Sequence, residues 1–152
     1  MNIYLLIILS AIVFEFLLQS TAHILNIKIL NPELPEEFKN YYDEKKYLHS
    51  QIYLRTNTQF SMIISSIDVA VILLAILLGF FNDIDQFVRS FGLSSIANGL
   101  IFFFILFIMQ DLLSTPLKLY KNFIIEERFG FNKMTLKTYI VDKLKAYGIK
   151  SF

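Results

Sequence analysis

Three long apolar segments constrain this chain more than any other feature of its sequence. They run from Ile3 to Ile29, from Phe60 to Phe81, and from Ile96 to about Leu113. A helix needs about 20 apolar residues to cross the hydrocarbon core of a bilayer, and each segment is close to this length. With 55% hydrophobic residues, the chain is also too apolar for an ordinary soluble domain. We therefore predict an all-α, multi-spanning membrane protein.

The first apolar segment is predicted to be a retained membrane helix rather than a secretory signal. No basic residue precedes it, and its apolar pattern continues to about Leu30, further than the apolar core of a signal. Within it, Glu15, Gln19 and His23 recur at every fourth position and therefore share one helix face. An ionisable face is costly against lipid, so it is expected either to line a water-filled chamber or to bond a neighbouring helix.

The second and third segments carry further polar side chains. Asn57, Ser61, Ser65 and Asp68 follow one another at three- and four-residue intervals, and more polar residues gather at the end of the third segment, before Pro116. The residues of the second segment form a second polar face, whereas those at the end of the third segment either mark a plain helix end leaving the membrane or extend the polar face. The candidate chamber-lining residues are Glu15, Gln19, His23, Asp68, Gln110 and Asp111.

The first connection is expected to contain an amphipathic surface helix. Pro32 and Pro35 end the first membrane helix, because proline lacks the backbone donor and disfavours helix in its predecessor. Residues 36–59 then alternate charged residues with regularly spaced aromatic rings, which suits a helix at the membrane surface. Their acids and His49 do not indicate a metal site, since lysines are interleaved among them as on a solvated face.

The second connection, residues 82–92, is predicted to be of mixed polarity and to rest on the bilayer interface through Val88 and Phe91, together with Leu93. Ser94 or Ser95 is expected to cap the third span.

After the third span comes a charged, aromatic loop with Gly130 at its centre. Glycine permits a turn there, and the rings of Phe129 and Phe131 are expected to be buried on either side of it. Asn132 or Thr135 is expected to cap a helix beginning near Leu136, the start of a fourth span. The fold is thus predicted to have three spans, the start of a fourth, and the surface helix between the first two.

Charge and composition exclude some functions. A net charge of +1 gives no basic face for nucleic acid, and the absence of cysteine excludes disulfides and thiolate metal sites. Basic residues concentrate in the first connection and the C-terminal part, whereas the second connection holds only Arg89. The positive-inside rule therefore places these two regions in the cytoplasm and the N-terminus outside.

Two motifs resemble a known family. The run from Phe123 to Lys133 closely resembles the loop before the fourth membrane helix of the type I CAAX prenyl proteases, which are integral membrane zinc metalloendopeptidases. The stretch from Leu34 to Ser61 resembles the segment that joins that family's first two helices. The resemblance covers nearly the whole chain. The family-motif residues in the run from Phe123 to Lys133 are Phe123, Glu126, Glu127, Gly130, Phe131 and Asn132.

The resemblance implies that residues 1–152 form the N-terminal transmembrane domain of such a protease, anchoring it and forming part of its chamber. It also implies zinc on a His-Glu-x-x-His helix, and a peptide or prenylated-protein substrate. Neither His23 nor His49 begins that motif, so the chain alone is expected to be inactive, to bind no cofactor, and to need a catalytic half or partner chain. Two alternatives remain open: a non-catalytic membrane scaffold that binds a protein partner, and an ion or proton pathway.

Overall fold

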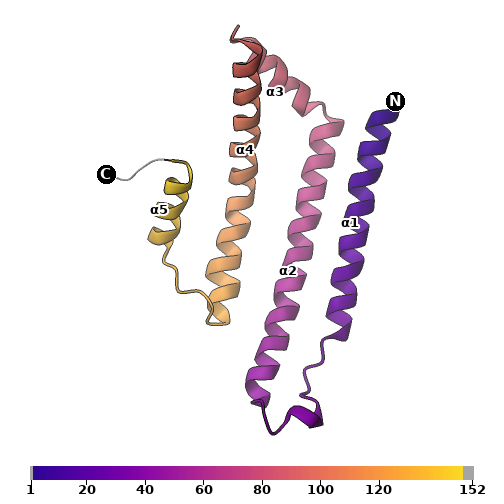
Figure 1. The fold of residues 1–152 in the computed structure, drawn as a ribbon, viewed down its shortest axis with the longest axis vertical. Coiled ribbons are helices and arrows are strands. Elements are labelled where there is room, and N and C mark those ends of the chain that lie inside the picture. Colours follow the sequence, from indigo (N-terminus) through magenta and orange to yellow (C-terminus); the bar gives the residue numbers. More distant parts are fainter. Residues whose placement is uncertain (1, 149–152) are drawn as a thin grey trace. The chain divides into compact units, whose positions relative to one another are not determined.

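The computed structural model describes residues 2–148, and all the regular secondary structure in this range is helical (Figure 1). It contains five α-helices together with a short 3-10 helix, η1, and a π-helix, η2. Their bounds are α1 (Ile3–Ile29), η1 (Glu36–Phe38), α2 (Glu44–Leu77), α3 (Phe80–Arg89), α4 (Ser95–Tyr120), η2 (Lys121–Glu126) and α5 (Leu136–Ala146). Three helices are long and apolar enough to cross a membrane: Ile3–Ile29, Glu44–Leu77 and Ser95–Glu126. The expected all-α fold with three spans is confirmed.

The residues form two compact units, Met1–Thr115 and Pro116–Phe152. In the first unit α1 and α2 lie side by side, and α3 packs against α2. Helix α4 begins in the first unit and continues into the second. The second unit contains the end of α4, η2 and α5.

Helix α1 has the bounds expected from the sequence. The Asn2 side chain accepts a hydrogen bond from the Tyr4 N–H at 3.1 Å and so caps the first turn. The helix ends at Ile29, before Pro32. The Asn31 side chain then accepts a hydrogen bond from the Glu33 N–H at 3.0 Å, an Asx turn that leads the chain away from the helix axis.

Helix α2 differs from the expectation at its start, because the amphipathic segment and the second span form one continuous helix. Asp43 caps it: its carboxylate accepts hydrogen bonds from the N–H groups of Lys45 at 2.8 Å and Lys46 at 3.1 Å. From Glu44 to Leu77 the sequence contains neither glycine nor proline, so nothing interrupts the helix where its composition changes from charged to apolar. The charged turns therefore extend the span along its own axis.

The second connection is a helix, α3, where the sequence analysis expected a connection of mixed polarity. Gly79 lies between α2 and α3 with φ +75°, a conformation that lets the chain reverse within one residue. Val88 is only 1% exposed and Ile84 is also buried, so the prediction that Val88 rests on the bilayer interface was wrong. Phe91 and Leu93 do remain half exposed. Phe80, Ile84, Phe87, Val88 and Phe91 recur at helical spacing, a signal that the sequence analysis overlooked.

Helix α4 starts as expected, with the Ser94 hydroxyl accepting a hydrogen bond from the Ala97 N–H at 3.3 Å. It does not end near Leu113 but continues through Pro116 to Tyr120. Proline has no N–H, so the α-helical hydrogen bond to the Leu112 carbonyl is missing at this point. The hydroxyl of Thr115, the residue before Pro116, donates to the carbonyl of Asp111, one turn earlier in the helix, at 2.5 Å. Such local rearrangements let membrane helices tolerate an internal proline.

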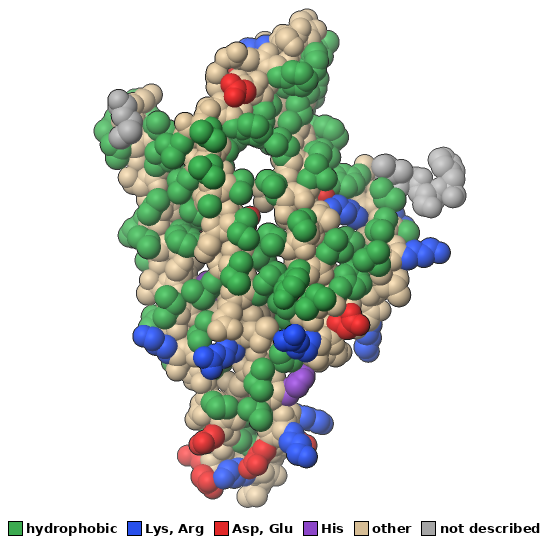
Figure 2. Space-filling view, turned by 180° about the vertical axis from the view of Figure 1, so that it is seen from behind, with side chains coloured by type: hydrophobic (Ala, Val, Ile, Leu, Met, Phe, Trp, Pro, Cys, Tyr) green, Lys and Arg blue, Asp and Glu red, His purple; other side chains and the backbone are tan. Residues whose placement is uncertain are grey.

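Apolar side chains are spread over much of the face shown in Figure 2. Among residues 2–148 only five hydrophobic side chains are buried: Leu34, Phe60, Ile84, Val88 and Ile125. None of the apolar residues of α1 or α4 is buried within this chain. Exposed apolar patches of this extent are not stable in water, so a bilayer or other membrane helices must cover them.

Candidate functional site

A polar cavity lies between α1, α2 and α4 within the first unit. Its volume is about 370 Å³. Four of the six residues expected to line a chamber are part of its wall: Glu15, Gln19, Asp68 and Gln110. Ser65 of α2 completes the polar lining. Three helices thus place their intramembrane polar side chains around one space.

Glu15 and Gln19 form a hydrogen-bonded pair in this cavity. The Gln19 Nε2 atom donates to the Glu15 Oε1 atom at 3.1 Å, one helical turn away. This bond orients both side chains along the same face of α1. It therefore keeps the Glu15 carboxylate, an acceptor, beside an amide that can also bond water or a peptide.

The structure does not bring the other two candidates into this wall. His23 lies one turn beyond Gln19 on α1 and is half-buried. Asp111 lies on α4 next to Gln110, and its carbonyl oxygen accepts hydrogen bonds from the hydroxyls of Ser114 and Thr115.

The cavity also has an apolar part that the sequence analysis did not name. Its apolar lining consists of Ile12, Phe16, Val69 and Ile72. Ile12, Phe16 and Ile72 lie three or four positions from Glu15, Gln19 and Asp68, respectively, and Val69 lies four positions from Ser65. Helical periodicity from the polar residues therefore finds them.

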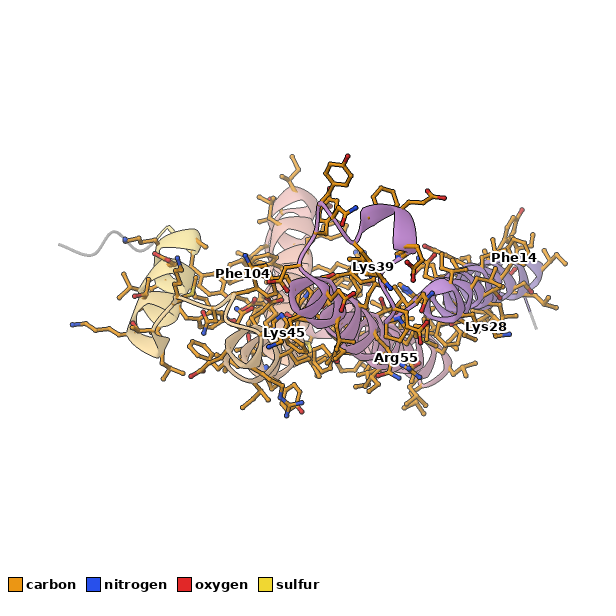
Figure 3. The ribbon with its side chains drawn as sticks, turned by 90° about the horizontal axis from the view of Figure 1, so that it is seen from below. Phe14, Lys28, Lys39, Lys45, Arg55 and Phe104 are labelled. Atoms are coloured by element: carbon orange, nitrogen blue, oxygen red, sulfur yellow. The ribbon has the colours of Figure 1, made fainter. Side chains whose placement is uncertain are left out.

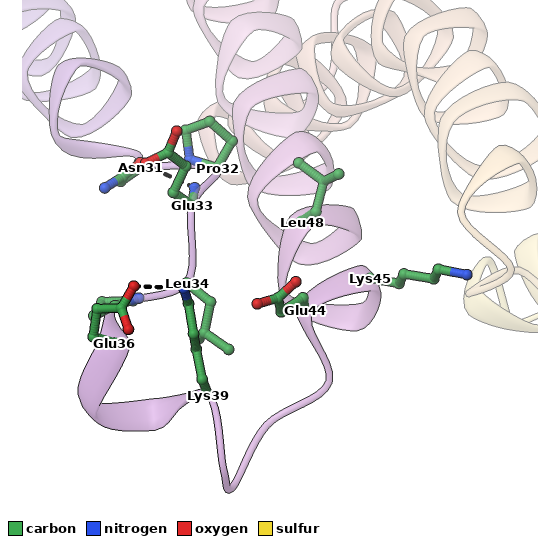
Figure 4. Close-up of a pocket in the computed structure, with 10 residues that line it drawn as sticks. Asn31, Pro32, Glu33, Leu34, Glu36, Lys39, Glu44, Lys45 and Leu48 are labelled. Atoms are coloured by element: carbon green, nitrogen blue, oxygen red, sulfur yellow. Dashed lines mark hydrogen bonds and ion pairs between the residues drawn. The ribbon is translucent and has the colours of Figure 1, made fainter.

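A second pocket is formed by the first connection and the start of α2 (Figure 4). Its volume is about 580 Å³, and Leu34 beside it is 8% exposed. The Lys39 Nζ atom donates to the Glu36 carboxylate at 2.6 Å, whereas the Lys45 side chain extends away from this pair. The hydrogen bond to Glu36, with attraction to Glu36, Glu44 and Glu33, raises the pKa of Lys39 above its ordinary value. The pocket includes Leu34, Pro35 and Glu36, the start of the family-like stretch in the first connection.

The run from Phe123 to Lys133 is partly helical, which corrects the expected loop. η2 covers Lys121–Glu126, and the helical conformation continues to Arg128. Gly130, with φ +75°, then ends it in a Schellman motif. In this motif the Phe131 N–H donates to the Glu126 carbonyl at 2.8 Å, and the Gly130 N–H donates to the Glu127 carbonyl at 3.0 Å. The turn at Gly130 is confirmed.

The remaining residues of this run serve the turn and the next helix. The Asn132 side chain accepts from the Met134 N–H at 2.8 Å, and Thr135 caps α5 by accepting from the Thr138 N–H at 3.2 Å. The Phe123 ring meets the Tyr139 ring edge to face, with centroids 6.2 Å apart. Phe131 is 57% exposed, so the prediction that its ring is buried beside the turn was wrong within this chain.

The described residues do not fit a zinc site. Within residues 2–148 no three His, Asp or Glu side chains are grouped so that they could hold a metal ion. We assign no step that involves a metal to this part of the molecule.

Comparison with known proteins identifies the family. A family model described as the CAAX prenyl protease N-terminal region, with five membrane helices, matches residues 23–152. The chain belongs to this family. The probable CAAX prenyl protease 1 of Schizosaccharomyces pombe is 36% identical over 130 residues, which are 77% of this chain and 27% of that protein. CAAX prenyl protease 1 of Saccharomyces cerevisiae is 29% identical over 129 residues, 78% of this chain and 28% of that protein.

The fold of this CAAX prenyl protease family member also matches a solved structure. The crystal structure of S. mikatae Ste24p superposes with a TM-score of 0.88 at 28% identity, and the match covers 98% of this chain and 36% of that one. The chain therefore spans about a quarter of the length of the curated relatives. It resembles their N-terminal membrane part and is a multi-pass integral membrane protein.

Proposed function

We propose that this chain anchors a CAAX prenyl protease-like zinc metalloendopeptidase in the membrane and forms part of the wall of its water-filled chamber. Family membership and the match to S. mikatae Ste24p support this role. The 152 residues contain no His-Glu-x-x-His motif, so in this proposal the zinc and the catalytic groups belong to another part of the assembled enzyme. The substrate is a peptide or a prenylated protein.

The observation that carries the proposal is the cavity lined by Glu15, Gln19, Asp68 and Gln110. Two carboxylates and two amides at membrane depth are stable only beside water, protein or one another. A chamber that admits a polar peptide backbone into the bilayer needs such groups, because amide and carboxylate side chains replace the hydrogen bonds that the backbone loses with water. The family relationship favours this role over the scaffold and ion-pathway alternatives.

Orientation is part of the proposal. The basic residues of the first connection and the C-terminal part place both on the cytoplasmic side by the positive-inside rule. The pocket at Leu34 and Lys39 and the turn at Gly130 would then face the same compartment. Both family motifs could there contact the catalytic part.

The test is a chimera in which this chain replaces the matching N-terminal part of the S. pombe relative. If the proposal holds, the chimera cleaves a prenylated CAAX peptide, and a zinc chelator abolishes the cleavage. A second chimera carries Glu15→Leu and Asp68→Leu, which remove both carboxylates from the cavity. Its activity should be lower than that of the first chimera. The proposal is contradicted if the chimera inserts in the membrane and unfolds at the same temperature as the S. pombe relative, yet does not cleave the peptide.

A further inference from the structure

A large apolar groove runs between α1 and α2, separate from the polar cavity. Its volume is about 960 Å³, near the upper end of the range of about 300–1,000 Å³ that is usual for small-molecule sites. Ile24 and Ile27 of α1 face Met62, Ile63 and Ile67 of α2 across it. Its other lining residues are Lys28, Gln59, Ser66 and Ala70. No acidic residue is part of this lining.

The groove lies on the opposite side of the α1–α2 pair from the polar cavity. Ile24 and Lys28 line the groove, whereas Glu15 and Gln19, about two and a half helical turns earlier, line the cavity. On α2, Gln59 lines the groove and Asp68, again about two and a half turns away, lines the cavity. Two residues that are two and a half turns apart point to opposite faces of a helix. The cavity is lined in part by Gln110 of α4, whereas the groove is lined by α1 and α2 alone. A charged face is costly against lipid, so we expect the apolar groove side to meet the lipid.

Positive charge is concentrated at one end of the groove. Lys28, in the last turn of α1, is part of the lining, and Arg55 lies one helical turn before Gln59 on α2. Both are labelled in Figure 3, where they come from the two neighbouring helices that form the groove. The span of α2 is apolar beyond this point, so these cations mark the boundary between hydrocarbon and headgroups.

We propose that this groove binds one anionic phospholipid of the bilayer. Its acyl chain lies against Ile24, Ile27 and Ile63, and its phosphate is bound by Lys28 and Arg55. The apolar wall of the groove suits the acyl chain of the lipid, and the two cations suit its negatively charged headgroup. The proposal rests on the membrane location of the chain and not on its role in proteolysis, so it can fail or hold independently of the proposed function.

The experiment uses the absence of cysteine from the chain. Ile63→Cys, labelled with a small fluorophore, reports on the groove in phosphatidylcholine vesicles that contain a brominated phospholipid as quencher. Brominated phosphatidylglycerol should quench this label at a lower mole fraction than brominated phosphatidylcholine does. One cation near the surface favours an anionic lipid about fivefold, so two should give a preference of at least that size. The matched control is Phe104→Cys on α4, an exposed ring outside the groove, where both lipids should quench alike.

A second pair of variants tests the charges. Lys28→Gln with Arg55→Gln should abolish the preference, whereas Lys133→Gln with Lys137→Gln, the same change in charge at other positions, should leave it intact. Circular dichroism confirms that each variant is folded. Equal quenching of Ile63→Cys by the two lipids overturns the proposal. Absence of quenching by either lipid also overturns it, because a protein segment or a second copy of the chain then covers the groove.

Discussion

The backbone N–H of Phe131 donates a hydrogen bond to the carbonyl of Glu126 at 2.8 Å, and so closes the helix that ends the third span. This bond and the bond from Gly130 to Glu127 require the left-handed conformation at Gly130, φ +75°. The run from Phe123 to Lys133, which resembles the family's motif, therefore contains a helix end with a defined geometry. The exposed Phe131 ring is presented at this end.

Gly130→Ala should destabilise this turn by about 1 kcal/mol, because a side chain opposes positive φ. No atom lies within 4 Å of an added Cβ, so the loss would come from the backbone and not from a clash. Gly99→Ala is the matched control: Gly99 has equally open surroundings but ordinary helical φ, and alanine there should be neutral or stabilising. Hydrogen exchange of the amides of residues 128–132 measures the difference. Equal exchange in both variants would contradict the role of Gly130.

Glu15→Cys and Asp68→Cys should react with a membrane-impermeant thiol reagent, because the polar cavity is expected to contain water. Phe14→Cys, next to Glu15 but exposed on another face of α1, should remain unlabelled in the bilayer. The measurement is the fraction of each variant that is labelled in sealed vesicles, with the reagent on one side or on both. Labelling of Phe14→Cys together with protection of both cavity positions would reverse the assignment of the two helix faces.

Val88→Ala should loosen α3, because Val88 is the most completely buried side chain in the described part of the chain. Removing two methyl groups from such a site costs about 2 kcal/mol. Amide hydrogen exchange in α3 should accelerate accordingly. Leu93→Ala, at a half-exposed position just after α3, should change it little. If the two variants behave alike, α3 is not held by this contact.

The pKa of Lys39 should fall toward its ordinary value of 10.5 in Glu36→Gln, because the hydrogen bond to Glu36 is the main cause of its rise. Since the folded pKa is raised, the stabilisation is fully present below pH 10.5 and is lost as the pH rises through the folded value. NMR titration of the Lys39 side chain measures its pKa in the two proteins. Glu37→Gln is the control, since Glu37 does not contribute to the shift. An unchanged pKa in Glu36→Gln would show that the ion pair does not persist in solution.

Several local features were predictable because their causes lie within a few residues. Pro32, which lacks an N–H, follows the end of α1, whereas Ser94, Thr135 and Gly130 act through hydrogen bonds to near neighbours in sequence. The missed helix α3 had a local signal too, in the helical spacing of Ile84 and Val88. The course of α4 through Pro116 was harder to predict, because a proline ends some helices and is tolerated in others according to how neighbouring groups rearrange.

The sequence by itself determined that this protein is built from membrane helices and which faces of those helices are polar, because both follow from the length and periodicity of apolar runs. The tertiary structure decided which polar faces meet. Gln110 joins Glu15 and Asp68 around one cavity, while His23 and Asp111, on the same helices, do not line it. It also decided that an apolar groove lies behind that cavity, with Lys28 in its wall. Helical periodicity gives each residue a direction only within its own helix. Which directions converge depends on how the helices pack.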